Sequence, residues 1–167
     1  MSASNLLVVM GVSGAGKTTV GELIARRLGW PFADGDDLQP KANIDKMRGG
    51  VPLTDADRAP WLKAIGAWMD ARIEAGQPGV VACSALKRAY RDTLRSGRPQ
   101  VRIVYLHGSE DQIARRLARR TGHFWPPQLL ATQFADLEPP GGDEDPIVVD
   151  VGAAPEAVAK AVIERLS

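Results

Sequence analysis

The most constraining stretch of this sequence is a run of five apolar residues, 6–10, that leads directly into Gly11-Val12-Ser13-Gly14-Ala15-Gly16-Lys17-Thr18. The apolar run predicts a buried strand, and the next eight residues match G-x-x-x-x-G-K-[ST], the pattern of a phosphate-binding loop. Glycines in this pattern let the backbone curl, so that successive N–H groups point at one anion. A helix predicted over 17–28 adds the positive end of its dipole. The stretch therefore predicts a nucleoside triphosphate site.

The chemistry of the loop residues indicates a nucleoside triphosphate bound with Mg²⁺. Lys17 supplies a point charge for the β and γ phosphates, and the hydroxyl of Thr18 is a suitable Mg²⁺ ligand. The alternative is an ordinary glycine-rich turn before a helix, which the strand-loop-helix context disfavours. The expected ATP-binding residues of the loop are Gly11, Ser13, Gly14, Ala15, Gly16, Lys17, Thr18 and Thr19.

Length and composition fit one globular domain over 1–167, with 44% hydrophobic and 25% charged residues. The net charge of +1 gives no indication of a nucleic-acid or membrane-surface partner. No apolar run approaches the ~20 residues that a transmembrane helix needs. Cys83 is the single cysteine, which excludes an intrachain disulfide and favours a reducing, cytoplasmic location.

The rest of the chain alternates between predicted strands and helices. Further strands are expected at 30–33, 79–83, 101–106 and 146–151; helices are expected over 40–47, 55–75, 109–120 and 128–137, with one ending near 94 and one opening at 155. The strands are continuous apolar runs, which predicts an α/β fold with a parallel five-stranded sheet and helices on both faces. Ligands of such sheets bind beyond the carboxyl ends of the strands, here at 34–37, 84–87 and 107–109.

Two acids, Asp34 and Asp36, follow the second strand beside the phosphate loop. In an extended segment, residues two apart face the same way, so one carboxylate can hold Mg²⁺ through water while the other accepts the proton of an attacking hydroxyl. The alternative is an Asp-Gly-Asp turn that caps the following helix. The D-x-x-G and N-K-x-D strings typical of GTPase switches do not occur, and no strand ends in the acid of a Walker B motif.

Basic residues form the other half of the expected site. Arg116 and Arg120 share one helix face, which is either a solvated surface or a lid that covers the triphosphate. The expected acceptor pocket contains Lys46, Arg48, Arg58, Lys87 and Arg91. Arg58 lies in the first turn of a predicted helix, where a cation is unfavourable unless an anion is close. An Arg fork binds a carboxylate or a phosphate equally well, so charge alone does not separate a sugar acid from a nucleotide.

Taken together, the motifs resemble the gluconokinase family, whose members phosphorylate D-gluconate on its 6-hydroxyl with ATP. The resemblance covers nearly the whole chain in the right order. The matching strings are the phosphate loop, Asp34-Gly35-Asp36-Asp37-Leu38, Asn43-Ile44-Asp45-Lys46-Met47, residues 52–62, residues 83–92, Gly122-His123-Phe124 and residues 132–139.

This resemblance implies a nucleoside-monophosphate-kinase-like fold with a substrate-binding helical segment at about 38–76 and a lid at about 116–128. It implies that Asp36 contacts the acceptor hydroxyl and that Asp34 and Thr18 hold Mg²⁺. The implied catalytic residues are Asp36, Lys17 and Arg120. The implied gluconate-binding residues are Asp36, Arg48, Arg58, Lys87, Arg91 and His123, while Arg116, Arg120 and Pro155 are implied to contact ATP.

Family members are commonly homodimers, which makes a homodimer the implied assembly. One departure from the family pattern is Gln39, which stands where the family usually has His. Glutamine has a neutral donor and acceptor but takes no proton near neutral pH, which argues against acid–base chemistry at this position.

Two alternative functions share the phosphate loop. A shikimate or nucleotide kinase has the same loop and paired acids, but shikimate kinases are expected to carry Gly-Gly-Gly where Cys83-Ser84-Ala85-Leu86-Lys87 follows the third strand here. A non-catalytic, nucleotide-binding regulatory module is the alternative from another class. The intact set of Lys17, Thr18, Asp34 and Asp36 argues against it.

Overall fold

The computed structural model describes residues 5–51, 53–118 and 127–166. The strands and helices alternate along the chain, as the sequence predicts. In chain order they are β1 (Leu6–Met10), α1 (Lys17–Leu28), β2 (Phe32–Asp34), a 3-10 helix (Gly35–Leu38), α2 (Lys41–Arg48), α3 (Asp55–Glu74), β3 (Gly79–Ala82), α4 (Arg88–Arg95), β4 (Val101–His107), α5 (Glu110–Ala118), α6 (Pro127–Asp136), a 3-10 helix (Gly142–Glu144), β5 (Ile147–Asp150) and α7 (Pro155–Leu166).

One parallel sheet lies at the centre of the molecule, with strand order β2-β3-β1-β4-β5. β1 is the middle strand, and Leu6 pairs with Gly79 of β3 on one side and with Val101 of β4 on the other. Because the order reverses at β1, the crevice beyond its carboxyl end is the topological switch point where such sheets bind ligands. The phosphate loop follows β1 directly and therefore lies at that point.

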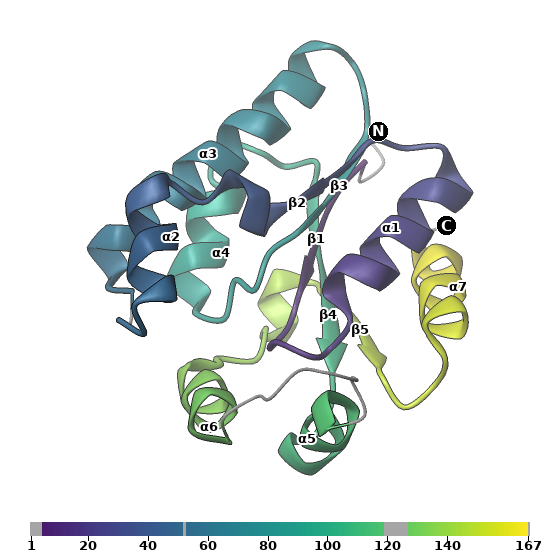
Figure 1. The fold of residues 1–167 in the computed structure, drawn as a ribbon. Coiled ribbons are helices and arrows are strands. Elements are labelled where there is room, and N and C mark those ends of the chain that lie inside the picture. The colour runs from purple at the N-terminus through teal and green to yellow at the C-terminus, as the bar shows by residue number, and fades with distance from the viewer. Residues whose placement is uncertain (1–4, 52, 119–126, 167) are drawn as a thin grey trace.

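Helices cover both faces of the sheet, with α1 and α7 on one side and α3 and α4 on the other (Figure 1). Successive residues of β1 face these two layers alternately. Leu7 and Val9 belong to the core beneath α1 and α7, whereas Leu6 and Val8 belong to the core beneath α3 and α4. Every residue of β1 is buried on one side or the other, which explains its uninterrupted apolar sequence.

Two predicted helix starts are confirmed by their hydrogen bonds. The Thr54 hydroxyl accepts from Asp57 N and Asp57 Oδ2 accepts from Thr54 N, which forms a capping box at the start of α3. Ser109 and Gln112 form the same reciprocal pair before α5. The second strand lies slightly later than expected, at Phe32–Asp34, so that Asp34 ends the strand.

The carboxyl ends of the strands gather the loops that the sequence marks as site-forming, and α5 and α6 lie at the same end of the molecule (Figure 1). The loop after β3 approaches the phosphate loop, since Gly11 N donates to Ser84 O at 3.3 Å. No helix within residues 5–51, 53–118 and 127–166 is long and apolar enough to cross a membrane.

Candidate active site

The phosphate loop has the backbone shape that an anion site requires. Gly16, the residue before α1, has φ of +91°, a left-handed conformation that residues with a side chain rarely adopt. The loop surrounds a hollow of about 180 Å³, and Lys17 Nζ donates to Val12 O at 3.2 Å beside it. The residues that line the hollow are Ser13, Gly14, Gly16, Lys17, Thr18, Thr19 and Leu117. Gly11 and Ala15 are buried at its base.

The acidic turn after β2 is joined to the loop through Asp34. Its Oδ2 accepts a hydrogen bond from the Thr18 hydroxyl at 3.1 Å, and its Oδ1 accepts from Asp36 N at 2.9 Å. Asp34 therefore also caps the 3-10 helix Gly35–Leu38, so the expected extended geometry of Asp34 and Asp36 is wrong and the turn interpretation is right. Capping by Asp34 is still compatible with its expected Mg²⁺ role, because a carboxylate has about four lone-pair acceptor sites.

Gly35 and Trp61 fix the position of this turn. A Cβ at Gly35 would lie 2.4 Å from Ala82 O, so only glycine allows the turn to approach β3 so closely. The Trp61 indole N–H of α3 donates to Gly35 O at 2.7 Å. Trp61 is 3% exposed, which confirms that it belongs to the core and shows that its polar end positions the acidic turn.

The environment of Asp36 suits a general base. Partial desolvation, together with the nearby carboxylates of Asp34 and Asp37, raises the pKa of Asp36 above its ordinary value, although Lys17 opposes this. A carboxylate with a raised pKa is a stronger proton acceptor while it remains ionised at neutral pH. The carboxyl group keeps an exposed surface from which it can meet a substrate hydroxyl.

The residues present fit a Mg²⁺ ion of the kind that phosphate loops use. The Thr18 hydroxyl and the Asp34 carboxylate are adjacent oxygen donors, which Mg²⁺ prefers. Within the described residues there is no group of three His, Cys, Asp or Glu side chains that could hold a metal alone. Magnesium bound here would therefore share its coordination between the protein, the phosphates of ATP and water.

A second hollow, of about 450 Å³, lies beside the phosphate loop between α5 and the start of α7. It brings together Arg116 and Pro155, two residues expected to contact ATP. Arg116 donates to Val151 O at 2.7 Å, and its guanidinium lies 3.2 Å from where a Cβ at Gly16 would stand. This contact places one cation at the border between the two hollows.

Two of the cations that the sequence predicts to bind the acceptor, Arg58 and Lys87, lie against one tyrosine, Tyr90. Arg58 donates to the Tyr90 hydroxyl at 3.0 Å, and the Arg58 guanidinium and the Lys87 ammonium lie 5.6 and 5.8 Å from the centre of the Tyr90 ring. The Tyr90 hydroxyl donates to Asp55, whose carboxylate also lies 3.5 Å from Lys87 Nζ. These two contacts hold the pKa of Asp55 below its ordinary value.

Arg91 is not a substrate-binding residue, which corrects the expectation from the sequence. It is fully buried, and all five of its N–H donors are engaged within the protein. Two donate to Glu144, and the others donate to the backbone carbonyls of Ala85, Leu86 and Glu138. Arg91 instead fixes the loop that leads to Lys87.

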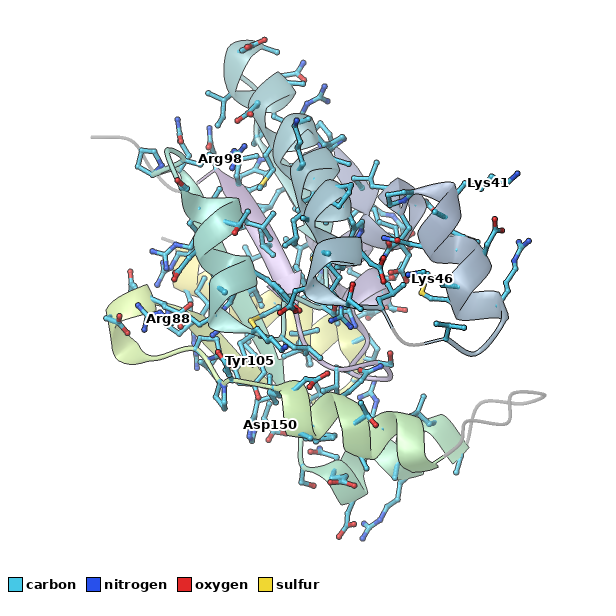
Figure 2. All side chains as sticks on the ribbon, turned by 90° about the vertical axis from the view of Figure 1, so that its left-hand side faces the viewer. Lys41, Lys46, Arg88, Arg98, Tyr105 and Asp150 are labelled. Carbon is cyan, nitrogen blue, oxygen red and sulfur yellow. The ribbon has the colours of Figure 1, made fainter. Side chains whose placement is uncertain are left out.

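Two basic residues of α2, Lys46 and Arg48, have different surroundings. Lys46 contacts both Asp57 carboxylate oxygens at 2.9 Å, so it joins α2 to α3; Figure 2 shows it turned toward α3, whereas Lys41 points outward. Arg48 is the last residue of α2 and is exposed. The cations that contact Tyr90 in the described part of the chain are Arg58 and Lys87.

Gln39 has a role that does not need a proton. Its Oε1 accepts a hydrogen bond at 2.9 Å from Asn43 Nδ2, which also donates to Asp57 O at 2.7 Å. Asn43 is 3% exposed, so both of its bonds compensate for burial of the amide. A histidine ring nitrogen could accept the same hydrogen bond from Asn43. Gln39 therefore replaces the histidine usual in the family in a structural role.

Two expected site residues, Arg120 and His123, lie outside the described residues, and so does most of the expected lid segment. Their assignments remain expectations. Cys83 lies at the end of β3, is 2% exposed, and burial raises the pKa of its thiol to about 12. Cys83 therefore packs in the core and is not a nucleophile.

Three residues near the site carry no role in the sequence-based expectations: Tyr90, Asp55 and Gln133. The contact between Tyr90 and Asp55 becomes visible only when α3 and α4 are packed together, because the two residues lie 35 positions apart. All three residues belong to strings shared with the gluconokinase family, which was the available signal for them.

Fold and site together define a phosphate-loop phosphotransferase, in which an acidic turn bonds the phosphate loop and two cations lie against Tyr90. Residues 6–140 match the family model described as AAA domain. A gluconokinase of Gluconobacter oxydans (strain 621H) is 50% identical over 159 residues, which cover 95% of this chain and 89% of that protein.

Two further comparisons agree. The thermoresistant gluconokinase of Escherichia coli (strain K12) is 45% identical over 98% of this chain and 97% of its own length. The crystal structure of a gluconokinase from Sinorhizobium meliloti 1021 is 48% identical and superposes with a TM-score of 0.90, covering 99% of this chain and 93% of that one. The chain belongs to the gluconokinase family.

Proposed function

We propose that this protein transfers the γ-phosphoryl group of ATP to the 6-hydroxyl of D-gluconate, giving 6-phospho-D-gluconate and ADP. The observation that carries the proposal is how the acidic turn with Asp36 is held. Asp34 bonds both Asp36 N and Thr18 of the phosphate loop, and Trp61 of α3, the helix that also carries Arg58, bonds Gly35 O. A hydroxyl acid that anchors its carboxylate on this pair can direct its far hydroxyl toward Asp36. The gluconokinase relatives support gluconate as that acid.

Each residue has a defined part in the proposed reaction. Arg58 and Lys87 bind the gluconate carboxylate, and Asp36 orients the 6-hydroxyl and accepts its proton as the oxygen attacks phosphorus. Lys17 and Arg116 neutralise charge on the phosphates, while the amides of the loop hold them in line. Bound Mg²⁺, held by Thr18 and Asp34, would neutralise negative charge on the β and γ phosphates.

The remaining assignments belong to the same proposal. Arg120 and His123 act from the segment at about 116–128, which we propose as the lid, and Arg48 acts from the substrate-binding segment at about 38–76. The single buried thiol supports action in the reducing cytoplasm. A homodimer remains a prediction from the family resemblance.

The experiment is ADP release with Mg-ATP against an acceptor panel of gluconate, other sugar acids, shikimate, AMP, CMP and no acceptor. Strong turnover with gluconate alone supports the proposal. Turnover with shikimate or a nucleotide keeps the phosphotransferase but overturns the acceptor. ATP binding without turnover for any acceptor supports a regulatory module.

A further inference from the structure

The side chain of Gln133, on α6, lies against the phosphate loop. Its Oε1 accepts a hydrogen bond from Ser13 N at 2.6 Å, and its Nε2 lies 2.8 Å from Ser13 Oγ, to which it donates. One planar amide therefore holds both the backbone and the side chain of a single loop residue. Because the two residues are 120 positions apart, this contact fixes the loop from outside its own segment.

The helix that carries Gln133 is itself anchored to the core. Leu130 is 3% exposed, and Phe134 and Leu137 pack against the buried clusters. Just after α6, Glu138 N donates to Leu86 O at 2.8 Å and Glu138 Oε1 accepts from Arg88 N at 2.9 Å. Gln133 is therefore presented from a fixed support, so it can impose a position on Ser13.

The contact with Gln133 also determines which backbone N–H groups of the loop can donate hydrogen bonds to the phosphates of ATP. While Gln133 occupies it, the N–H of Ser13 is not a phosphate donor. The first intrahelical bond of α1 runs from Val20 N to Gly16 O, so the N–H groups of Thr18 and Thr19 precede it and suit an anion. Ser13 then shapes the cradle instead of contributing its amide.

We propose that Gln133 is a positioning residue for phosphoryl transfer, which clamps Ser13 and keeps the phosphate loop in its triphosphate-binding shape before ATP arrives. A loop without the clamp must become ordered during binding, and that lost entropy weakens affinity. The inference goes beyond the proposed reaction with gluconate, because it concerns only the ATP side of the site.

The test compares Gln133→Met, Ser13→Ala and the double variant. Methionine keeps the length of the side chain but removes both hydrogen bonds, so Mg-ATP should bind about tenfold more weakly in calorimetric titration without an acceptor. Ser13→Ala removes only the Oγ bond and should cost less. In the Gln133→Met background, Ser13→Ala should add almost nothing, because its partner is already gone.

Gln77→Met makes the same chemical change at an exposed position and should leave ATP affinity unchanged. In turnover assays, Gln133→Met should raise the KM for ATP and leave the KM for the acceptor as it was. A lower Tm with unaltered ATP affinity would assign Gln133 a purely structural role and overturn the proposal. Additive effects of the two single variants would overturn it as well. Because the titration needs no acceptor, its result does not depend on which sugar acid the protein phosphorylates.

Discussion

At the scale of single residues, Asp36 carries the sharpest prediction. Asp36→Asn removes the proton acceptor but keeps the size of the side chain, so phosphoryl transfer should fall by about 10²–10⁴-fold while Mg-ATP still binds. Asp37→Asn is the matched control, since Asp37 is an exposed acid on the same 3-10 helix. Steady-state turnover and ATP titration measure the two effects. Near-normal turnover in Asp36→Asn would remove Asp36 from its assigned role.

The raised pKa of Asp36 sets the pH dependence of turnover. The base is active only when ionised, so kcat should fall on the acid side with a midpoint above about 4, the ordinary value for aspartate. The charge of Asp37 contributes to the raised pKa, so Asp37→Asn should move this midpoint to lower pH. A pH–rate profile of both proteins checks the sign, and a shift to higher pH in the variant would contradict it.

Tyr90 should control recognition of the acceptor. Tyr90→Phe keeps the ring beneath Arg58 and Lys87 but removes the hydroxyl that bonds Arg58 and Asp55, so the KM for gluconate should rise about tenfold with the KM for ATP unchanged. Tyr90→Leu also removes the ring that both cations face, so it should cost more.

Tyr105→Phe is the control for this series, because Tyr105 is a second buried tyrosine in the same core cluster, at the end of β4 (Figure 2). It should leave both KM values unchanged. Equal effects of Tyr90→Phe and Tyr105→Phe would mean that the loss arises from the core and not from the cationic pocket.

At the scale of elements, the buried Arg91–Glu144 pair joins α4 to the 3-10 helix Gly142–Glu144. Arg91→Met leaves the Glu144 carboxylate buried without its partner, which should lower the free energy of unfolding by about 3–5 kcal/mol. Urea unfolding measures this loss. Arg88, also on α4 (Figure 2), forms an exposed ion pair with Asp143. Arg88→Met breaks this pair and should lower the free energy of unfolding far less. Equal losses would contradict the role of burial.

The same pair predicts how stability depends on pH. Burial alone would raise the pKa of Glu144, but hydrogen bonds from Arg91 and from Gly141 N hold it below its ordinary value. A carboxyl group with a depressed pKa stabilises the fold fully above its unfolded pKa, about 4.3 for glutamate, and loses that contribution as the pH falls through the folded value. Glu144→Gln should therefore be less stable at neutral pH and lose less of its stability in acid.

Features of the helices and strands that depend on neighbouring residues could be predicted from the sequence, whereas those that depend on packing between elements could not. The phosphate loop, the helix starts near 55 and 109 and the buried strand 6–10 were predictable because their determinants are close in sequence. Arg91 was misassigned because its partner Glu144 is 53 residues away, and only the packing of α4 shows that it faces inward. Gln133 was missed as a site residue for the same reason.

At the scale of the whole molecule, the sheet order explains how these distant residues meet. Parallel strands require long crossovers, so each loop at the carboxyl edge follows a strand, leads into a helix and lies beside loops from other parts of the chain. The sequence predicts the layers because buried strands are continuously apolar. It does not give the strand order, which depends on contacts between elements.

The central place of β1 has a further consequence for synthesis of the protein. Leu6–Met10 leaves the ribosome before both of its neighbours, Gly79–Ala82 and Val101–His107. Until β4 emerges, five apolar residues that the finished protein buries on both sides lack a complete sheet around them. Such a nascent chain exposes an unpaired strand edge until both neighbours are made, which makes it a natural client for chaperones.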